Sequence, residues 1–302
     1  MGSDLDAIRA TLGTLGVVDH SLAPLCTYRV GGSAAIFVEA ESVDDLLSVQ
    51  EAVSQTGSAV LVVGRGSNLL VSDSGFDGIV VQLGPAYSAI EVDIENAQLR
   101  CGASALMPVA ARRSSSAGLT GFEWAVGVPG SIGGGVRMNA GGHGSDMNAN
   151  LVEVDLIDLA GEGVATVRAV DLDLAYRASN VSNTQVVLSS TFQLDVGDVA
   201  DSKQEVSEIV QWRRKHQPGG QNAGSVFRNP EDDSAGRIIE SLGMKGFRIG
   251  SAEVSDKHAN FFQADPEGSA NDMYELIMTV QQRVSDEVGI QLHPENRLIG
   301  FG

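Results

Sequence analysis

Two glycine-rich segments of the sequence could hold a phosphate-bearing ligand. Residues 64–68 (Gly-Arg-Gly-Ser-Asn) follow an apolar run, and residues 127–144 contain 8 glycines in 18 positions. Glycine lets backbone N–H groups approach an anion closely, and a nearby hydroxyl or amide adds a donor. The alternatives are an ordinary glycine-rich hairpin at 64–68 and a flexible loop at 127–144, although Pro129 and Val136 favour ordered backbone in the second segment. Neither segment has Gly-x-Gly-x-x-Gly opening a helix, so a Rossmann dinucleotide site is not indicated.

Three polar segments carry further groups that could do chemistry. Ser225 follows a glycine within residues 222–230, Arg177 lies within 176–179, and Glu295 and Arg297 lie near the C-terminus. Ser225 lacks the Gly-x-Ser-x-Gly setting of an acyl-transfer nucleophile, so a hydrolase is not favoured. Taken one at a time, a turn hydroxyl and solvated surface charges are the simpler interpretations.

Composition narrows the class of protein. The 302 residues are enough for about two domains, and 43% apolar with 20% charged residues is typical of a globular protein. Lys+Arg 20 against Asp+Glu 39 gives a net charge of −19, which disfavours binding to nucleic acid or to an anionic membrane surface. There is no apolar run of membrane-spanning length, and the acidic N-terminus is unlike a signal peptide. We therefore expect a cytoplasmic protein without membrane insertion.

The cysteines and histidines argue against a disulfide-stabilised protein and against a metal-binding protein. Cys26 and Cys101 are too few for a disulfide scaffold. The histidines have no acidic residues or cysteines at ligand spacing, so we expect no metal site.

Predicted helices and strands surround the glycine-rich segments. Ser42 as N-cap and Gly57 as stop predict a helix over 42–56, and a strand over 59–63 runs directly into residues 64–68. Residues 127–144 hold too many glycines for a regular helix or strand. The other elements expected in this part are strands at 79–83, 89–92, 97–101, 151–159 and 185–194 and a helix at 105–117.

The C-terminal third reads as a separate region. Residues 197–202 resemble a domain junction, and we place a boundary near residue 200. The clearest element is a helix over 270–288, with one apolar stripe and Gly289 as its stop. The other elements expected here are helices at 202–215 and 235–242 and short strands at 247–249 and 260–263. The whole pattern predicts an α+β or α/β chain.

Six segments, taken in chain order, resemble the UDP-N-acetylenolpyruvoylglucosamine reductase (MurB) family. They are residues 27–32, 64–73, 127–144, 176–179, 223–230 and 295–297. The resemblance runs from about residue 20 to 301, and six motifs in the right order are far more specific than any one of them. The chain is similar to the shorter subtype (type II), because the predicted helix 202–215 leads almost directly into the Ser225 segment and leaves no room for the tyrosine-bearing insertion of longer members.

This resemblance implies a particular α+β architecture. It is a two-part FAD-binding domain of the vanillyl-alcohol-oxidase (PCMH) type with a smaller α/β substrate-binding domain. We expect the two FAD-binding parts at residues 1–78 and 79–199 and the substrate-binding domain at 200–302, with the last strand able to return to the FAD domain. The boundary near residue 200 agrees with this division.

The resemblance also implies an activity. The expected enzyme is an FAD-containing oxidoreductase that uses NADPH to reduce UDP-N-acetylglucosamine enolpyruvate to UDP-N-acetylmuramate, in peptidoglycan precursor synthesis and hence in cell wall biogenesis, cell shape and cell division. NADPH would reduce the flavin and leave before the substrate binds in the same place. We expect a monomer or a weak homo-oligomer.

Residue roles follow from the same resemblance. Arg177 would bind the substrate carboxylate, Ser225 would donate the proton to C2, and Glu295 would stabilise the enol intermediate, for which burial should raise its pKa. The substrate would also be contacted by Arg228, Asn229 and Arg297. The residues expected to bind FAD are Gly64, Arg65, Gly66, Ser67, Asn68, Gly127, Pro129, Gly130, Ser131, Gly133, Gly134, Asn139 and Ala140.

Two positions depart from the family pattern. Arg228 stands where the family usually has lysine, and the two cations are not geometrically equivalent. His143 stands where an aromatic residue is more common, so a covalent link to FAD through His143 is one alternative. For function, the alternatives are a flavin-dependent oxidase or dehydrogenase of the same fold acting on a small alcohol or hydroxy acid, and a regulatory protein that only binds the UDP-sugar.

Overall fold

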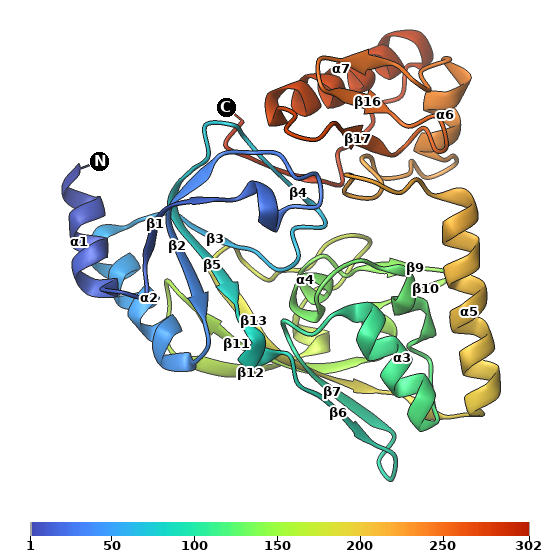
Figure 1. Cartoon of the computed structure of the whole chain (residues 1–302). Coiled ribbons are helices and arrows are strands. Elements are labelled where there is room, and N and C mark those ends of the chain that lie inside the picture. The colour runs from blue at the N-terminus through green and yellow to red at the C-terminus, as the bar shows by residue number, and fades with distance from the viewer. Residues whose placement is uncertain (1, 302) are drawn as a thin grey trace. The chain divides into compact units, whose positions relative to one another are not determined.

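The computed structural model describes residues 2–301, which form two compact units (Figure 1). Unit 1 comprises the chain up to residue 18 together with residues 36–65 and 78–212. Unit 2 comprises residues 19–35 and 66–77 and the chain from residue 213 onward. The chain combines helices with mainly antiparallel sheets, so the expected α+β class is confirmed. The functional division at residues 78 and 199 stays a prediction.

A four-stranded sheet in the order β1-β2-β5-β3 is covered by the helices α1 (Gly2–Leu12) and α2 (Val43–Thr56) (Figure 1). Apolar side chains of both helices and of β2 and β5 form one buried cluster, which includes Leu12, Ile36, Leu46 and Ile79. The strands are β1 (Val17–Ser21), β2 (Ser33–Ala40), β3 (Val60–Val62) and β5 (Phe76–Leu83). This sheet matters for the site because β3 ends two residues before Gly64.

Local chemistry sets the limits of α2 as predicted. The hydroxyl of Ser42 accepts the N–H of Asp45 at 3.2 Å, and the carboxylate of Asp45 accepts the N–H of Ser42 at 3.0 Å. This reciprocal capping box satisfies two otherwise unpaired donors. Gly57 ends the helix with φ +67°, a left-handed conformation that glycine adopts without strain.

A second, five-stranded antiparallel sheet forms the other half of unit 1. Its order is β12-β11-β13-β7-β6, and β11 and β13 also contribute to the cluster under α1 and α2. The strands are β6 (Ile90–Asp93), β7 (Gln98–Gly102), β11 (Leu151–Asp158), β12 (Val164–Arg168) and β13 (Gln185–Gln193). Four of these match the predicted strands, and β12 was not predicted.

A second core of unit 1 packs helices and short connections against this sheet. Phe122, Phe192, Ile132 and Met147 are fully buried there. The helices and helical turns of this region are α3 (Met107–Ala117), α4 (Ile132–Arg137), α5 (Val199–His216), η2 (Pro85–Tyr87), η3 (Glu123–Gly127), η4 (Met147–Ala149) and η5 (Ala169–Asp171). The remaining short strands are β8 (Leu119–Thr120), β9 (Gly141–Gly142), β10 (Ser145–Asp146) and β14 (Asp195–Val196).

The prediction that residues 127–144 contain no regular helix or strand is wrong. The helix α4 begins after Ser131, whose hydroxyl accepts the N–H of Gly134, and β9 pairs with β10. Close packing explains the glycines: a Cβ at Gly133 would lie 2.9 Å from the Cβ of Ala103, and one at Gly135 would lie 2.3 Å from the Cε of Met147. The glycines therefore let a short helix approach its neighbours closely.

Unit 2 builds a separate core from α6 (Ala235–Ser241), α7 (Ala270–Val288) and the sheet β15-β16-β17 (Figure 1). The predicted bounds of α7 are confirmed, with Ser269 as N-cap and Gly289 at φ +73° as C-cap. Asp73 adds to this cap, since its carboxylate accepts the N–H groups of Ala270 at 2.9 Å and Asn271 at 3.1 Å. The other elements are η1 (Ala23–Leu25), β4 (Leu69–Val71), β15 (Arg248–Ile249), β16 (Ala252–Val254), β17 (Phe262–Ala264) and β18 (Arg297–Ile299).

The last strand returns to an early segment of the chain. β18 pairs in parallel with β4, with Arg297 opposite Leu69 and Ile299 opposite Val71. This pairing places residues 295–297 next to residue 68. Among the helices in residues 2–301, none has both the length and the apolar character that a membrane span requires.

Candidate active site

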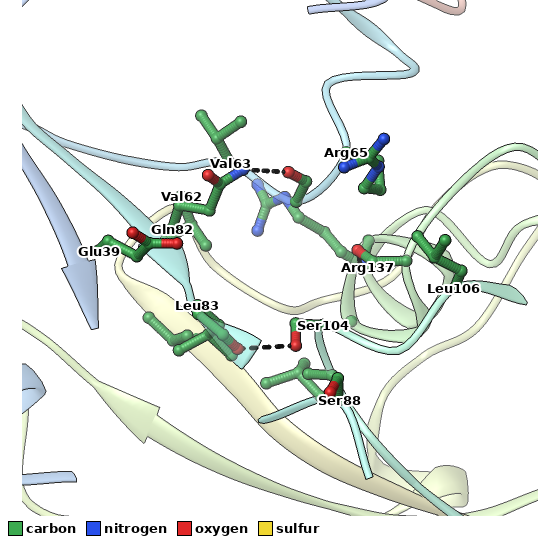
Figure 2. A pocket seen from close by; sticks show the side chains of 18 of the residues that line it. Glu39, Val62, Val63, Arg65, Gln82, Leu83, Ser88, Ser104, Leu106 and Arg137 are labelled. Carbon is green, nitrogen blue, oxygen red and sulfur yellow. Dashed lines mark hydrogen bonds between the residues drawn. The ribbon is translucent and has the colours of Figure 1, made fainter. Parts of the chain in front are cut away.

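A cavity of about 400 Å³ lies in unit 1 where β3 ends and α4 begins (Figure 2). Of the residues expected to bind FAD, five line it, namely Gly64, Arg65, Ser131, Gly133 and Gly134. The remaining lining consists of Glu39, Val62, Val63, Gln82, Leu83, Gly84, Pro85, Ser88, Ala103, Ser104, Leu106, Arg137, Val181, Gln185, Val186 and Val187. The structure therefore brings the two glycine-rich segments together at one site.

The close approach of these two segments, with Ser131 in its observed side-chain conformation, leaves room only for glycine at position 64. A Cβ at Gly64 would lie 2.4 Å from the Oγ of Ser131. Gln82 holds the loop from the neighbouring strand, since its Nε2 donates to the carbonyl oxygen of Gly64 at 2.7 Å (Figure 2). On the opposite side, the hydroxyl of Ser104 donates to the carbonyl of Gly84 at 2.9 Å (Figure 2).

The first turn of α4 already uses two of its N–H groups. Ile132 donates to the carbonyl oxygen of Ala105 and Gly133 donates to that of Ala103, both at 2.9 Å. These groups are committed to protein carbonyls. A ligand at this turn would instead meet the hydroxyl of Ser131 and the backbone of Gly134, both of which line the cavity.

The cavity lining is polar on some faces and apolar on others. Arg65 and Arg137 supply positive charge, Glu39 supplies negative charge, and several valines and leucines supply apolar surface (Figure 2). The guanidinium of Arg137 is oriented by the chain, because its Nη1 donates to the carbonyl of Val181 at 2.5 Å and its Nη2 to the Oδ1 of Asn183 at 2.6 Å. Such a lining fits FAD, which combines an anionic pyrophosphate with a large planar apolar ring system.

Arg137 was missed in the sequence analysis. The available signal was its position, because it is the arginine of the glycine-rich segment 127–144. Gln82 and Ser104 carried no comparable signal, since they lie on ordinary strand and turn positions.

Other residues expected to bind FAD do not line this cavity. Asn139 is buried, and its Nδ2 donates to Asp146 at 3.1 Å and to the carbonyl of Ala175 at 3.0 Å, while its Oδ1 accepts the N–H of Asn148 at 3.0 Å. The N–H of Ala140 donates to the carbonyl of Gly135 at 2.8 Å. The remaining ones are Gly127, Pro129 and Gly130 in unit 1 and Gly66, Ser67 and Asn68 in unit 2. Their cofactor roles stay predictions.

Arg177 occupies the tip of a tight turn in unit 1. Ala175 and Ala178 exchange two backbone hydrogen bonds of 3.0 Å each, and Arg177 has φ +55°, a conformation that non-glycine residues rarely adopt. Its guanidinium lies 5.1 Å from the centre of the Tyr176 ring and donates to the carbonyl of Gly141 at 2.9 Å. The turn thus holds the arginine against the glycine-rich segment.

Ser225 and Glu295 lie on two directly paired segments of unit 2. The N–H of Glu295 donates to the carbonyl of Val226 at 2.7 Å, and the N–H of Arg228 donates to the carbonyl of His293 at 3.0 Å. The burial of Val226 and of Phe227 anchors the first segment in the core. The structure therefore brings Ser225, Arg228 and Glu295 together on two hydrogen-bonded backbone segments.

Asn68 and Arg297 add further hydrogen bonds to this pair of segments. The Nδ2 of Asn68 donates to the carbonyl of Glu295 at 3.0 Å, and the N–H of Arg297 donates to the carbonyl of Asn68 at 2.9 Å. Burial lowers the pKa of the Arg297 guanidinium from its usual value. Asn229 is exposed, and its Oδ1 accepts the N–H of Ala235 at 3.0 Å, so this side chain caps the start of α6.

His143 packs in unit 1 against an aromatic ring. Its ring meets that of Trp212 edge-on at 5.2 Å, and a Cβ at Gly127 would lie 2.8 Å from its Cδ2. The histidine therefore has a packing role, and the alternative of a covalent link to FAD stays untested.

Residues of both units match known protein families. Residues 34–166 match the family described as FAD binding domain, and residues 215–299 match the C-terminal domain of UDP-N-acetylenolpyruvoylglucosamine reductase. The reductase of that name from Synechococcus sp. strain WH7803 is 41% identical over 286 residues, covering 93% of this chain and 92% of the relative. The one from Rubrobacter xylanophilus is 36% identical over 284 residues, covering 93% and 94%. The crystal structure of the reductase (MurB) from Thermus caldophilus superposes with a TM-score of 0.79 at 29% identity, covering 94% of this chain and 99% of that one.

Proposed function

The chain belongs to the UDP-N-acetylenolpyruvoylglucosamine reductase family, and we propose that it reduces UDP-N-acetylglucosamine enolpyruvate to UDP-N-acetylmuramate with NADPH and bound FAD. The observation that carries this proposal is the backbone pairing of the Ser225 segment with the Glu295 segment. It brings a hydroxyl and a carboxyl group onto two hydrogen-bonded segments, where one substrate can meet both. The reaction belongs to peptidoglycan precursor synthesis, so cell wall biogenesis depends on it.

The cavity at Gly64 and Ser131 is the proposed place of FAD. When bound, FAD carries reducing equivalents from NADPH to the enolpyruvyl group. Arg65 and Arg137 would supply positive charge for its anionic part, and the apolar side chains of the lining, Val63 and Val187 among them, would contact its apolar surface.

Three residues are assigned to the chemistry at the substrate. Arg177 binds the carboxylate and stabilises the negative charge that develops there. Ser225 holds a proton at its Oγ and delivers it to C2. Glu295 stabilises the enol intermediate, and the UDP-sugar is contacted by Arg228, Asn229 and Arg297.

An anaerobic two-step experiment tests the proposal. The purified holoenzyme is reduced with NADPH, excess nucleotide is removed, UDP-N-acetylglucosamine enolpyruvate is added, and the absorbance of oxidised flavin is followed. We expect the oxidised spectrum to return rapidly with formation of UDP-N-acetylmuramate. No return with this substrate, followed by fast recovery on admitting air, would overturn the proposal in favour of a flavin oxidase.

A further inference from the structure

The buried side chain of Asn296 joins several segments of unit 2. Its Oδ1 accepts the hydroxyl hydrogen of Tyr28 at 2.9 Å. Its Nδ2 lies 2.9 Å from the Oδ1 of Asn68, 3.3 Å from the carbonyl oxygen of Ala223 and 3.4 Å from that of Ser225. Asn296 is 4% exposed and Tyr28 is 0% exposed, so these hydrogen bonds form away from water, where each is stronger.

The partners allow the Asn296 amide one orientation. The carbonyl oxygens of Ala223 and Ser225 only accept, so they must face the NH₂ group, and the hydroxyl of Tyr28 then donates to Oδ1. Burial raises the pKa of the Tyr28 phenol above its ordinary value of 10.0, so it remains a donor at neutral pH. The amide of Asn68 is oriented in turn, because its Oδ1 accepts from Asn296 and its Nδ2 donates to the carbonyl of Glu295.

We propose that Asn296 is a positioning residue for the proton-transfer step, holding the main chain of Ser225 directly and that of Glu295 through Asn68. This inference rests on the proposed function, in which Ser225 and Glu295 act on the substrate. An apolar side chain at position 296 would leave buried acceptors without a donor, and the cheapest relief is a shift of the Ser225 segment. A displacement of about 1 Å in a catalytic group can slow a reaction roughly 100-fold.

The main test is Asn296→Ala, measured on the holoenzyme in the two half-reactions separately. We expect flavin reoxidation by UDP-N-acetylglucosamine enolpyruvate to slow roughly 10- to 100-fold and flavin reduction by NADPH to change less than about twofold. In a background that carries both Ser225→Ala and Glu295→Gln, Asn296→Ala should slow reoxidation by less than about threefold further, because both groups through which it acts are already replaced.

Hydrogen exchange gives a readout independent of activity. In Asn296→Ala, the N–H groups of Arg228 and Glu295, which join the two paired segments, should exchange faster, while those of α7 keep their protection. Tyr28→Phe serves as a second, milder variant, since it removes only the hydroxyl that orients the amide, and it should slow the same half-reaction. The matched control is Asp272→Asn, which weakens the contacts of Asp272 with the N–H and hydroxyl of Ser251 (both 2.7 Å) elsewhere in unit 2 and should leave both half-reactions unchanged.

The outcomes separate this inference from the proposed function. A wild-type reoxidation rate in both Asn296→Ala and Tyr28→Phe, equal losses in both half-reactions, or losses that multiply fully when Asn296→Ala is added to Ser225→Ala and Glu295→Gln would overturn the role of Asn296. A wild-type enzyme whose reduced flavin is not reoxidised by the substrate would overturn the proposed function instead. In that case unchanged exchange at Arg228 and Glu295 in Asn296→Ala would still count against the positioning role.

Discussion

At the scale of residues, the proposed chemistry depends on side chains whose backbone is firmly held. Ser225 precedes the buried Val226, and its own carbonyl oxygen accepts a hydrogen bond from Asn296. The N–H of Glu295 donates to Val226, and its carbonyl oxygen accepts from Asn68. Arg177 is held by a strained turn. These side chains can therefore be exchanged singly with little effect on the fold, which makes their roles testable.

Ser225→Ala should separate the two half-reactions. The variant loses the proposed proton donor, so flavin reoxidation by the enolpyruvyl substrate should slow roughly 10²- to 10⁴-fold, whereas reduction by NADPH stays nearly intact. Stopped-flow absorbance of the flavin measures both rates. Equal loss in the two half-reactions would contradict the assignment.

Glu295→Gln should impair the same half-reaction. The amide keeps the size of the carboxylic acid but not its acidity, so reoxidation should slow by about 10- to 100-fold, less than the loss expected for Ser225→Ala. The measurement is the same, with NADPH-driven reduction as the internal control. An unchanged reoxidation rate would remove Glu295 from the mechanism.

At the scale of elements, the FAD site depends on how closely the end of β3 approaches the start of α4. Gly64→Ala would place a methyl group 2.4 Å from the Oγ of Ser131, so the Ser131 side chain must rotate away from the N–H of Gly134 or one of the two segments must move. Overpacking of this kind typically costs about 1–3 kcal/mol, which corresponds to FAD affinity weakened roughly 5- to 150-fold. Fluorescence titration of the flavin-free protein with FAD measures this affinity.

Gly219→Ala is the matched control for that prediction. A Cβ at Gly219 meets nothing within 4 Å, so the substitution should leave FAD affinity unchanged. If Gly64→Ala binds FAD as tightly as this control, the cavity at Gly64 is not the cofactor site.

At the scale of the whole molecule, each compact unit contains one buried cysteine. Burial raises the pKa of Cys26 in unit 2 to about 11 and that of Cys101 in unit 1 to about 12. Because the thiolate is the reactive form, neither cysteine should be modified by a thiol reagent at pH 8 in the native protein. Single variants, Cys26→Ala and Cys101→Ala, under increasing denaturant should show each remaining thiol becoming reactive only as its own unit unfolds. Rapid modification of either thiol in the native protein would contradict this.

The same shifts give stability a pH dependence with a definite sign. A raised pKa in the folded state means that the folded protein holds these thiol protons more tightly than the unfolded chain. The contribution of the two thiols to the free energy of unfolding is complete below their ordinary pKa of 9.0. It is lost as the pH rises above 9.0 and through the folded-state values of about 11 and 12. Denaturant titrations of the native protein at pH 8 and pH 10 should therefore show lower stability at pH 10, and a double Cys26→Ala, Cys101→Ala variant should lose part of that difference.

Local sequence was enough to predict the elements whose ends are set by neighbouring residues. The helices α2 and α7 have the expected limits because caps such as Ser42 and Gly289 act within one turn. The motifs likewise identified the family. Gly64 and Gly133, both expected to bind FAD, line one cavity, and their cofactor role stays a prediction.

The tertiary structure was needed wherever the partner of a group is distant in the chain. Asn296 and Asn68 are 228 positions apart, yet their side chains are hydrogen-bonded. Similarly, the guanidinium of Arg137 is oriented at the cavity by hydrogen bonds to the distant residues 181 and 183. The helix α4 was not predicted from the sequence, because glycine is a poor helix former in isolation. Glycine is favoured there by the close approach of Ala103 and Met147. Propensity and periodicity report on a residue's immediate neighbours, whereas burial and long-range hydrogen bonds depend on which segments the folded chain places side by side.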